Sequence, residues 1–93
     1  MIKSFKTKDT EKLFNRYWVR AFQHVEERAR VKLEMIDAAE ALEDLRKPPG
    51  NQLEALGGDR KGQHSIRINK QWRICFTWGD DNHAYEVEIC DYH

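Results

Sequence analysis

Apolar residues in the first half of the chain recur first with a strand period and then with a helix period. Residues 2–6 alternate apolar and polar side chains, which predicts a short, half-buried strand. Thr10 can cap a helix that follows, because its hydroxyl can accept a hydrogen bond from a free N–H group of the first turn. Apolar positions three and four residues apart come next: Leu13, Phe14, Tyr17, Trp18 and Phe22. They predict a first helix with one apolar stripe.

A second helical pattern follows after a short interruption. Its apolar positions, between which the residues are mostly charged, are Val25, Ala29, Leu33 and Ile36. The pattern predicts a helix from near Val25 to about Leu45, with or without a break at residues 37–39. Residues 48–50, Pro-Pro-Gly, are then expected to end helical structure outright, because proline lacks a backbone donor and restricts the residue before it.

The period changes to two after a glycine-rich loop at residues 51–63, where missing side chains let the backbone approach a ligand closely. Alternating stretches predict three strands, at residues 64–68, 72–78 and 84–90, joined by tight turns at 69–70 and 79–82. Together with the strand at 2–6, they predict an α+β domain whose helices pack on one face of an antiparallel sheet. A length of 93 residues fits a single domain spanning 1–93.

Composition limits the kinds of function without choosing one. Apolar residues make up 40% of the chain and charged residues 34%, so a real core can form beneath a very polar surface. The formal net charge is zero, which argues against capture of nucleic acid by overall charge. The charge is nevertheless segregated, because residues 60–73 contain five Lys or Arg without an acid and residues 34–44 contain five acids without a base.

The cysteines and histidines suggest neither a disulfide nor a metal site. Cys75 and Cys90 lie in strand-like stretches without metal-ligand spacing and are expected to be reduced core thiols. His24, His64 and His83 are scattered, so we expect no metal and no other cofactor. The polar start resembles no export signal, and no apolar run approaches the roughly 20 residues that span a bilayer. A cytoplasmic protein with no membrane partner is therefore expected.

Strand alternation places two arginines where they could act on a phosphate. Arg67 and Arg73 flank the predicted hairpin turn, and both are expected on the sheet face opposite the isoleucines. Their planar guanidinium groups could bind the same phosphate. Alternatively, they could form ion pairs across the strands with Glu86 and Glu88. The spacing alone does not choose between these two interpretations.

The chain closes with three residues that can all move protons, Asp91, Tyr92 and His93. RNA cleavage without a metal needs a base for the ribose 2′-hydroxyl, cations for the phosphate and an acid for the leaving 5′-oxygen. A histidine combined with arginines would meet this need. A terminal histidine that is only solvated, and a tyrosine that belongs to the core, are the simpler alternatives.

Three ordered motifs, at residues 53–63, 72–76 and 91–93, together with the opening residues 1–6, resemble the HigB toxins of the RelE superfamily. The resemblance covers nearly the full chain and is weakest between residues 9 and 48. It implies a fold like that of microbial ribonucleases. It also implies an endoribonuclease that cuts messenger RNA at the ribosome by metal-free attack of the 2′-hydroxyl, with free RNA a poor substrate.

The resemblance also implies roles for particular residues. Arg73 is expected to stabilise the phosphate in the transition state, His93 to transfer a proton and Tyr92 to stack on a base or orient a group. Asp91 is expected to orient His93 or to raise its pKa. Backbone phosphates are expected to contact the cations Arg60, Lys61, Arg67 and Lys70.

Two positions depart from the family pattern. Several relatives have His at the position of Glu54 and Lys at the position of Gly57, and both residues have been assigned catalytic work there. Three interpretations follow for this chain: Lys61 supplies the missing charge, Glu54 acts as the base, or the protein is a slow enzyme.

The implied partners are a HigA-like helix-turn-helix antitoxin, the ribosome and its message, with operator DNA contacted only through the antitoxin. Phe14, Tyr17 and Trp18 are expected to belong to the core, and the alternative is that they dock the antitoxin. Two other functions compete with the ribosome-dependent nuclease. One is a catalytically weak module that regulates transcription within the toxin–antitoxin complex, and the other is a nuclease acting on free RNA.

Overall fold

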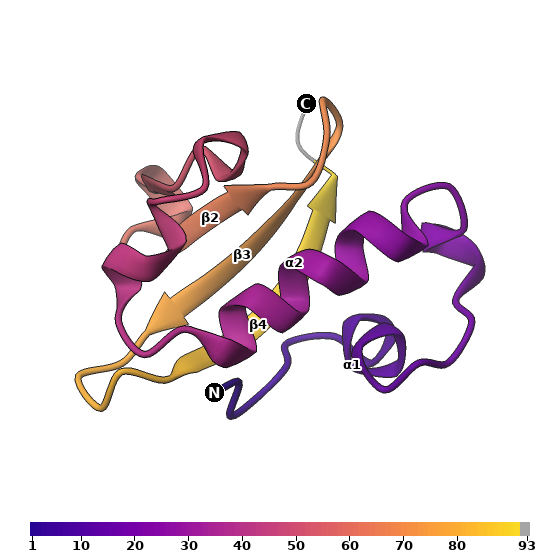
Figure 1. Ribbon diagram of the computed structural model, residues 1–93, viewed down its shortest axis with the longest axis horizontal. Coiled ribbons are helices and arrows are strands. Elements are labelled where there is room, and N and C mark those ends of the chain that lie inside the picture. Colours follow the sequence, from indigo (N-terminus) through magenta and orange to yellow (C-terminus); the bar gives the residue numbers. More distant parts are fainter. Residues whose placement is uncertain (92–93) are drawn as a thin grey trace.

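A four-stranded antiparallel sheet carries the helices on one face in the computed structural model, which describes residues 1–91 (Figure 1). The strands follow one another as a simple meander in the order β1-β2-β3-β4. This arrangement confirms the α+β class and the three consecutive strands expected in the second half. The helices and strands are α1 (Lys8–Phe14), α2 (Glu26–Ala38), β1 (Glu54–Ala55), β2 (His64–Arg67), β3 (Trp72–Trp78) and β4 (Ala84–Asp91).

The strand predicted at residues 2–6 is not a regular strand. Ile2 and Phe5 form only isolated parallel bridges, to Ala84 and Val87 of β4. The ladder cannot run on between these bridges, because Glu86 adopts a left-handed backbone (φ 52°) and donates its N–H to the Ser4 hydroxyl at 2.9 Å. The fourth strand is instead β1, which forms within the glycine-rich loop and pairs with β2 at the other edge. With only two residues, β1 is too short to show an alternation of apolar and polar positions in the sequence.

The first helix begins earlier and ends earlier than its sequence pattern predicts. Thr7, not Thr10, caps α1, since its Oγ1 accepts a hydrogen bond from the Thr10 N–H at 3.4 Å. Thr10 is fully buried, and its Oγ1 accepts a hydrogen bond from the Ile89 N–H of β4 at 3.1 Å. The helix stops at Phe14, and Arg16 then takes a left-handed conformation with φ 69°. This reversal carries the chain away from the predicted stripe.

The stripe therefore divides into buried and exposed rings. Phe14 is half-buried against Phe5, with ring centroids 5.5 Å apart. Phe22 is buried in a 3-10 turn (Arg20–Phe22) and meets the ring of Trp72 edge-on at 5.6 Å. Tyr17 and Trp18, however, are 65% and 63% exposed. The prediction that these two belong to the core was wrong, because it assumed that the helix continued past Phe14.

The second helix breaks where the sequence allowed a break. Helix α2 ends at Ala38, Ala39 is extended, and a 3-10 turn (Leu42–Leu45) completes the predicted stretch. Helical structure does not end outright at the prolines, because a further 3-10 turn spans Pro49–Asn51. Asn51 is fully buried there and donates its Nδ2 to the Leu45 carbonyl oxygen at 3.1 Å. This bond holds the turn that leads into β1.

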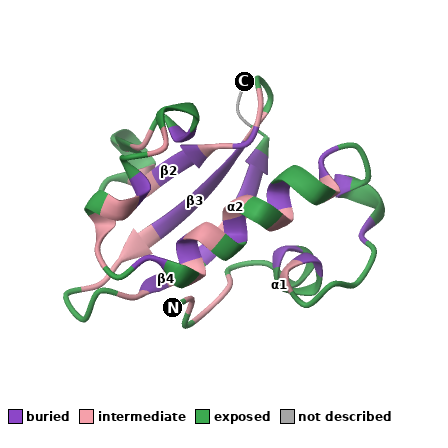
Figure 2. Cartoon of the chain, in the orientation of Figure 1, coloured by how far each residue is buried: buried purple, intermediate pink, exposed green. Residues whose placement is uncertain are grey.

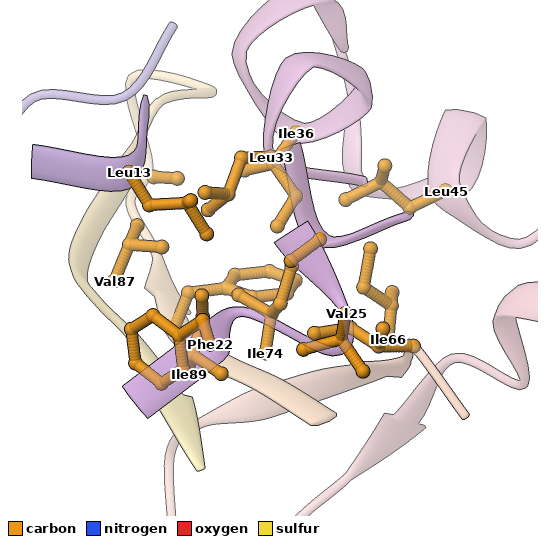
Figure 3. Packing of buried hydrophobic residues seen from close by; sticks show 14 of the residues in the cluster. Leu13, Phe22, Val25, Leu33, Ile36, Leu45, Ile66, Ile74, Val87 and Ile89 are labelled. Atoms are coloured by element: carbon orange, nitrogen blue, oxygen red, sulfur yellow. The ribbon is translucent and has the colours of Figure 1, made fainter. Parts of the chain in front are cut away.

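The core lies between α2 and the sheet (Figure 3). Helix α2 turns a buried stripe toward the strands and an exposed one outward (Figure 2). The strand residues of the core face are those expected from alternation: Ile66, Ile68, Ile74 and Phe76. The same alternation sends Ser65, Arg67, Arg73 and Cys75 to the opposite face, where Ser65 pairs with Cys75 and Arg67 with Arg73. That second face carries the candidate site.

No helix within residues 1–91 is long and apolar enough to cross a membrane. The same residues contain no group of three or more His, Cys, Asp or Glu side chains that could hold a metal ion.

Candidate active site

Arg73 lies at the centre of the site, near the start of β3, and is 7% exposed. Its Nε donates to the Ser65 hydroxyl at 2.8 Å, and its Nη2 donates to the Gln52 carbonyl oxygen at 2.8 Å. Gln52 presents that carbonyl from a left-handed backbone with φ 44°. A buried guanidinium needs such acceptors, because an unpaired buried charge is strongly unfavourable. The contacts hold Arg73 in one position.

Glu54 stands beside Arg73 at the more open side of the site. The Arg73 Nη2 is 3.5 Å from the Glu54 Oε1, and the Glu54 side chain remains 49% exposed. Strand β1 sets this contact, since Glu54 pairs with Ser65, the residue that also hydrogen bonds Arg73. A largely buried guanidinium and a half-exposed carboxylate thus meet on this face of the sheet. These are the two kinds of group that take up a proton and stabilise a phosphate.

A second charged cluster lies further along the same face, around Glu88. Its side chain is 13% exposed and contacts Lys6 Nζ at 3.2 Å and Arg60 Nη2 at 3.6 Å. Burial opposes ionisation of Glu88, but the Cys90 thiol, Lys6 and Arg60 outweigh it and lower the pKa of the carboxyl. Arg60 also donates to the Gln63 Oε1 at 3.1 Å. Arg60, which was expected to contact a backbone phosphate, is therefore engaged by groups of the protein itself.

The structure can be compared with the ion pairs to Glu86 and Glu88 that the sequence allowed for Arg67 and Arg73. Glu88 pairs with Lys6 and Arg60, whereas the ion pair of Arg73 is with Glu54. Arg67 donates its Nε to the Asn69 carbonyl oxygen at 3.1 Å. The paired register of Arg67 and Arg73 brings the two arginines side by side as expected. Among residues 1–91, Glu54, rather than Glu86 or Glu88, forms an ion pair with Arg73.

The remaining predicted cations lie on loops around this centre. Lys61 is exposed just after the 3-10 turn Gly58–Arg60, and Lys70 is exposed in the β2–β3 turn. That turn is the predicted hairpin, and Asn69 stabilises it by accepting the Trp72 N–H at 2.8 Å. Within the described chain, Glu54 forms an ion pair with Arg73 and with neither of these lysines.

The two cysteines are free and buried, as expected, but they lie on the site face. Cys90 pairs with Arg73 across β3 and β4, and its thiol donates to the Glu88 Oε1 at 3.2 Å. The proximity of Cys90 lowers the pKa of the Cys75 thiol, which burial opposes and Arg60 favours, whereas the proximity of Cys75 together with burial raises the pKa of Cys90. The thiols therefore belong to the polar cluster rather than to the apolar core.

The terminal motif is described only at its first residue. Asp91 is exposed at the end of β4 and accepts a hydrogen bond from the Gln71 Nε2 at 3.1 Å. Tyr92 and His93 lie outside the described residues, so the expectation that Asp91 orients His93 remains a prediction.

Sequence reasoning missed three groups that build the site: Lys6, Gln52 and Ser65. Gln52 acts through its backbone carbonyl, which no side-chain pattern reveals. Ser65 was assigned to the correct face but given no contact. Lys6 reaches Glu88 only because the first residues lie along β4, a long-range pairing that local patterns do not encode.

The comparisons with known proteins concern first the fold and then the family. The chain superimposes on the YoeB–YefM complex from Staphylococcus aureus with a TM-score of 0.61 and 24% identity, over 100% of this chain and 98% of that one. Residues 3–93 match the family described as RelE-like toxin of type II toxin-antitoxin system HigB. The chain belongs to this HigB toxin family.

Two relatives agree with the family assignment. Endoribonuclease HigB of Proteus vulgaris is 34% identical over 94 residues, which cover 100% of both chains. Toxin HigB-1 of Vibrio cholerae is 59% identical over 49 residues, which make up 53% of this chain and 52% of that protein. The chain thus spans about half the length of the Vibrio cholerae relative, but the whole length of the Proteus vulgaris one.

Proposed function

We propose that this toxin is an endoribonuclease that cuts messenger RNA on the ribosome. The observation that carries the proposal is the contact between Glu54 and Arg73, whose charged groups are 3.5 Å apart. Cleavage without a metal requires a proton acceptor for the 2′-hydroxyl beside a cation for the phosphate. The full-length similarity to an endoribonuclease of Proteus vulgaris supports the same activity here.

In the proposed reaction, Glu54 takes the proton of the 2′-hydroxyl while the 2′-oxygen attacks the adjacent phosphorus. The bond from phosphorus to the 5′-oxygen breaks, leaving a 2′,3′-cyclic phosphate on one fragment and a 5′-hydroxyl on the other. Arg73 donates hydrogen bonds to the non-bridging oxygens, on which negative charge builds up in the transition state. Its bonds to Ser65 and Gln52 keep it in place, so little reorganisation is needed during the reaction.

The acid that protonates the 5′-oxygen is proposed to be His93, with Tyr92 stacking on a base, as the family resemblance implies. Of the interpretations that the sequence leaves open, Glu54 as the base is favoured over Lys61 as the source of the missing charge. Glu54 contacts Arg73 directly, whereas Lys61 is an exposed loop residue. In this proposal, the carboxylate of Glu54 takes the place of the histidine that the resemblance implies for several relatives. Arg73 keeps the role of the family's catalytic arginine.

The ribosome and an antitoxin are the proposed partners. A chain with zero net charge attracts long RNA weakly, and a ribosome that presents the message would supply the positioning instead. We propose a HigA-like helix-turn-helix antitoxin as the neutralising partner, with operator DNA bound only through it, and the cytoplasm as the place of action. A structural neighbour of this chain, YoeB, was solved as a complex with YefM.

A reconstituted translation reaction with a defined message tests this function. The wild-type protein should produce discrete cuts within codons only when ribosomes are translating. Arg73→Ala and His93→Ala should remove the cuts, and expression of either variant should no longer arrest growth. Cleavage of the same RNA without ribosomes would replace this proposal with a free-RNA nuclease, and undiminished arrest by both variants would contradict the assigned site.

A catalytically weak module that regulates transcription is the second candidate function. One observation favours it, because Arg60 is held by Glu88 at 3.6 Å. The family resemblance adds that Gly57 stands where several relatives have a lysine. In that case the wild-type protein would leave messages intact during translation while the antitoxin complex still bound operator DNA.

A further inference from the structure

A basic groove lies at the end of the sheet that carries the β2–β3 turn. It has a volume of about 480 Å³ and is lined by Arg28, Gly50, Arg67, Ile68, Asn69, Lys70 and Gln71. The first turns of α2 reach this end of the sheet, which brings Arg28 to the turn (Figure 1). Three cations therefore face one hollow, and none of the described residues that line it is acidic.

These cations differ from others on the same surface because acids do not neutralise them. Nearby arginines are paired, Arg30 with Glu26 at 3.1 Å and Arg16 with Glu34 at 3.2 Å. Within residues 1–91, Arg28 and Lys70 form neither an ion pair nor a side-chain hydrogen bond, and Arg67 contacts only a carbonyl oxygen. The groove keeps its positive charge in a chain that is neutral as a whole.

The helix sequence gives Arg28 a like charge and no acid three or four positions away. Within α2, Lys32 is four positions away on the same face and Val31 is three away. Burial, together with the guanidinium of Arg28, lowers the pKa of Lys32. Like charges on one helix face repel each other and lower the stability of the helix. A bound anion would relieve this repulsion.

We propose that this groove binds the phosphodiester backbone of RNA, as a second phosphate site next to the candidate active site. The inference rests on the proposed function and adds Arg28, which the sequence motifs do not single out. Arg67 connects the two sites, because it lines the groove and pairs with Arg73 across β2 and β3. Strand β1 covers only His64 and Ser65, which leaves the edge of β2 open at Arg67.

The lining fits a phosphate better than a base. Guanidinium and ammonium groups bind phosphate oxygens through charge-assisted hydrogen bonds. The described lining holds no aromatic ring on which a base could stack, and Asn69 and Gln71 add polar groups at its rim. The site would therefore bind RNA without regard to sequence, and the phosphates could come from the message or from ribosomal RNA.

Binding titrations against salt test the groove with a probe that the enzyme cannot cut. The probe is a short single-stranded RNA with 2′-O-methyl groups, which lacks the attacking hydroxyl. Arg28→Ala and Lys70→Ala should each weaken binding roughly three- to tenfold and reduce the slope of log K against log salt by about 0.7. Arg28→Lys should restore most of the slope, because it keeps the charge.

Lys3→Ala is the matched control, since Lys3 is an exposed cation beside Ala84, at the opposite end of the sheet. It should bind the probe like the wild type. If Arg28→Ala lowers the thermal midpoint, Lys70→Ala decides the question, because Lys70 is exposed in a turn. Wild-type affinity and salt slope in both groove variants, with the probe and with the ribosomes described next, would overturn the proposal.

A second arm of the experiment identifies the source of the phosphates. Binding is measured to ribosomes that carry no message as well as to the RNA probe. A loss confined to the ribosomes assigns the groove to ribosomal RNA, and a loss with the probe assigns it to the message. Failure of the wild-type protein to cut messages would reject the proposed nuclease, whereas equal binding by wild type and groove variants in both arms would reject the groove alone.

Discussion

The carboxylate of Glu54 lies 3.5 Å from the guanidinium of Arg73, although 19 positions separate them in the sequence and the strand that presents Glu54 has only two residues. Arg73 is buried and held by Ser65 and Gln52, whereas Glu54 is half exposed. A fixed cation beneath an accessible carboxylate suits a reaction in which the substrate brings its own nucleophile.

Replacing Glu54 with Gln should reduce the rate of message cleavage by roughly 10²- to 10⁴-fold, because the amide cannot accept the 2′-hydroxyl proton. Thermal stability should change little, since the side chain is 49% exposed. The matched variant Glu54→His supplies another side chain that can accept a proton and should recover much of the activity. Equal cutting rates for Glu54→Gln and the wild type would assign the proton transfer to another residue.

Arg73→Lys should lower both activity and stability. A lysine keeps the charge but cannot donate from one planar group to Ser65 and Gln52 at once. We expect cleavage to fall roughly 10²- to 10³-fold and the free energy of unfolding to fall by about 1–3 kcal/mol. Single-turnover cleavage and urea unfolding measure the two effects. Ser65→Ala, which removes one anchor but leaves the guanidinium, should show a smaller loss of both.

Glu88 should make folding sensitive to acid. Its pKa is lowered in the folded protein, so its contribution to stability is present above the unfolded pKa and is lost as the pH falls through the folded value. At pH 7, Glu88→Gln should reduce the free energy of unfolding by roughly 1–3 kcal/mol. The difference from wild type should shrink below about pH 4.

The control for Glu88 is Glu43→Gln, which breaks an exposed ion pair with Arg46. That change should cost less than about 1 kcal/mol at any pH. A constant penalty for Glu88→Gln across the acid range would mean that its ionisation does not stabilise the fold.

Tyr17 and Trp18 should contribute to antitoxin binding. They are 65% and 63% exposed, and large aromatic side chains often dominate interfaces. Trp18→Ala should weaken the complex with the antitoxin by at least tenfold while leaving thermal unfolding unchanged. Val31→Ala, an exposed apolar residue on α2, serves as the comparison. If both variants bind the antitoxin equally tightly, its interface lies elsewhere.

Strands β2, β3 and β4 were predictable from the sequence because their signals are local, whereas β1 was not. Alternation in β2 and β3 assigned Ile66 and Ile74 to the core and Arg73 to the other face, and the register agrees. The α1 cap was not predictable in this way, because Thr7 and Thr10 are equally suitable caps in isolation. The contact of Thr10 with the Ile89 N–H in β4 decides between them.

The strand and face of Arg73 were predictable, but its contact with Glu54 was not. Arg73 stands in a motif and on a clear strand, whereas Glu54 as the base was one of three interpretations of the departure from the family pattern. The contact between them depends on β1 and on the turn at Asn51, both of which form through non-local pairing. For Arg60, the loop motif predicted contact with a phosphate, and the folded chain places its guanidinium beside the Glu88 carboxylate.

The hydrogen bond from the Glu86 N–H to Ser4 joins residues 82 positions apart. During synthesis, residues 2–5 stay without these two bridges until β4 has been made, because both bridges join them to Ala84 and Val87. Contacts of such long range slow folding. An extension fused ahead of Ile2 would act directly on this closure.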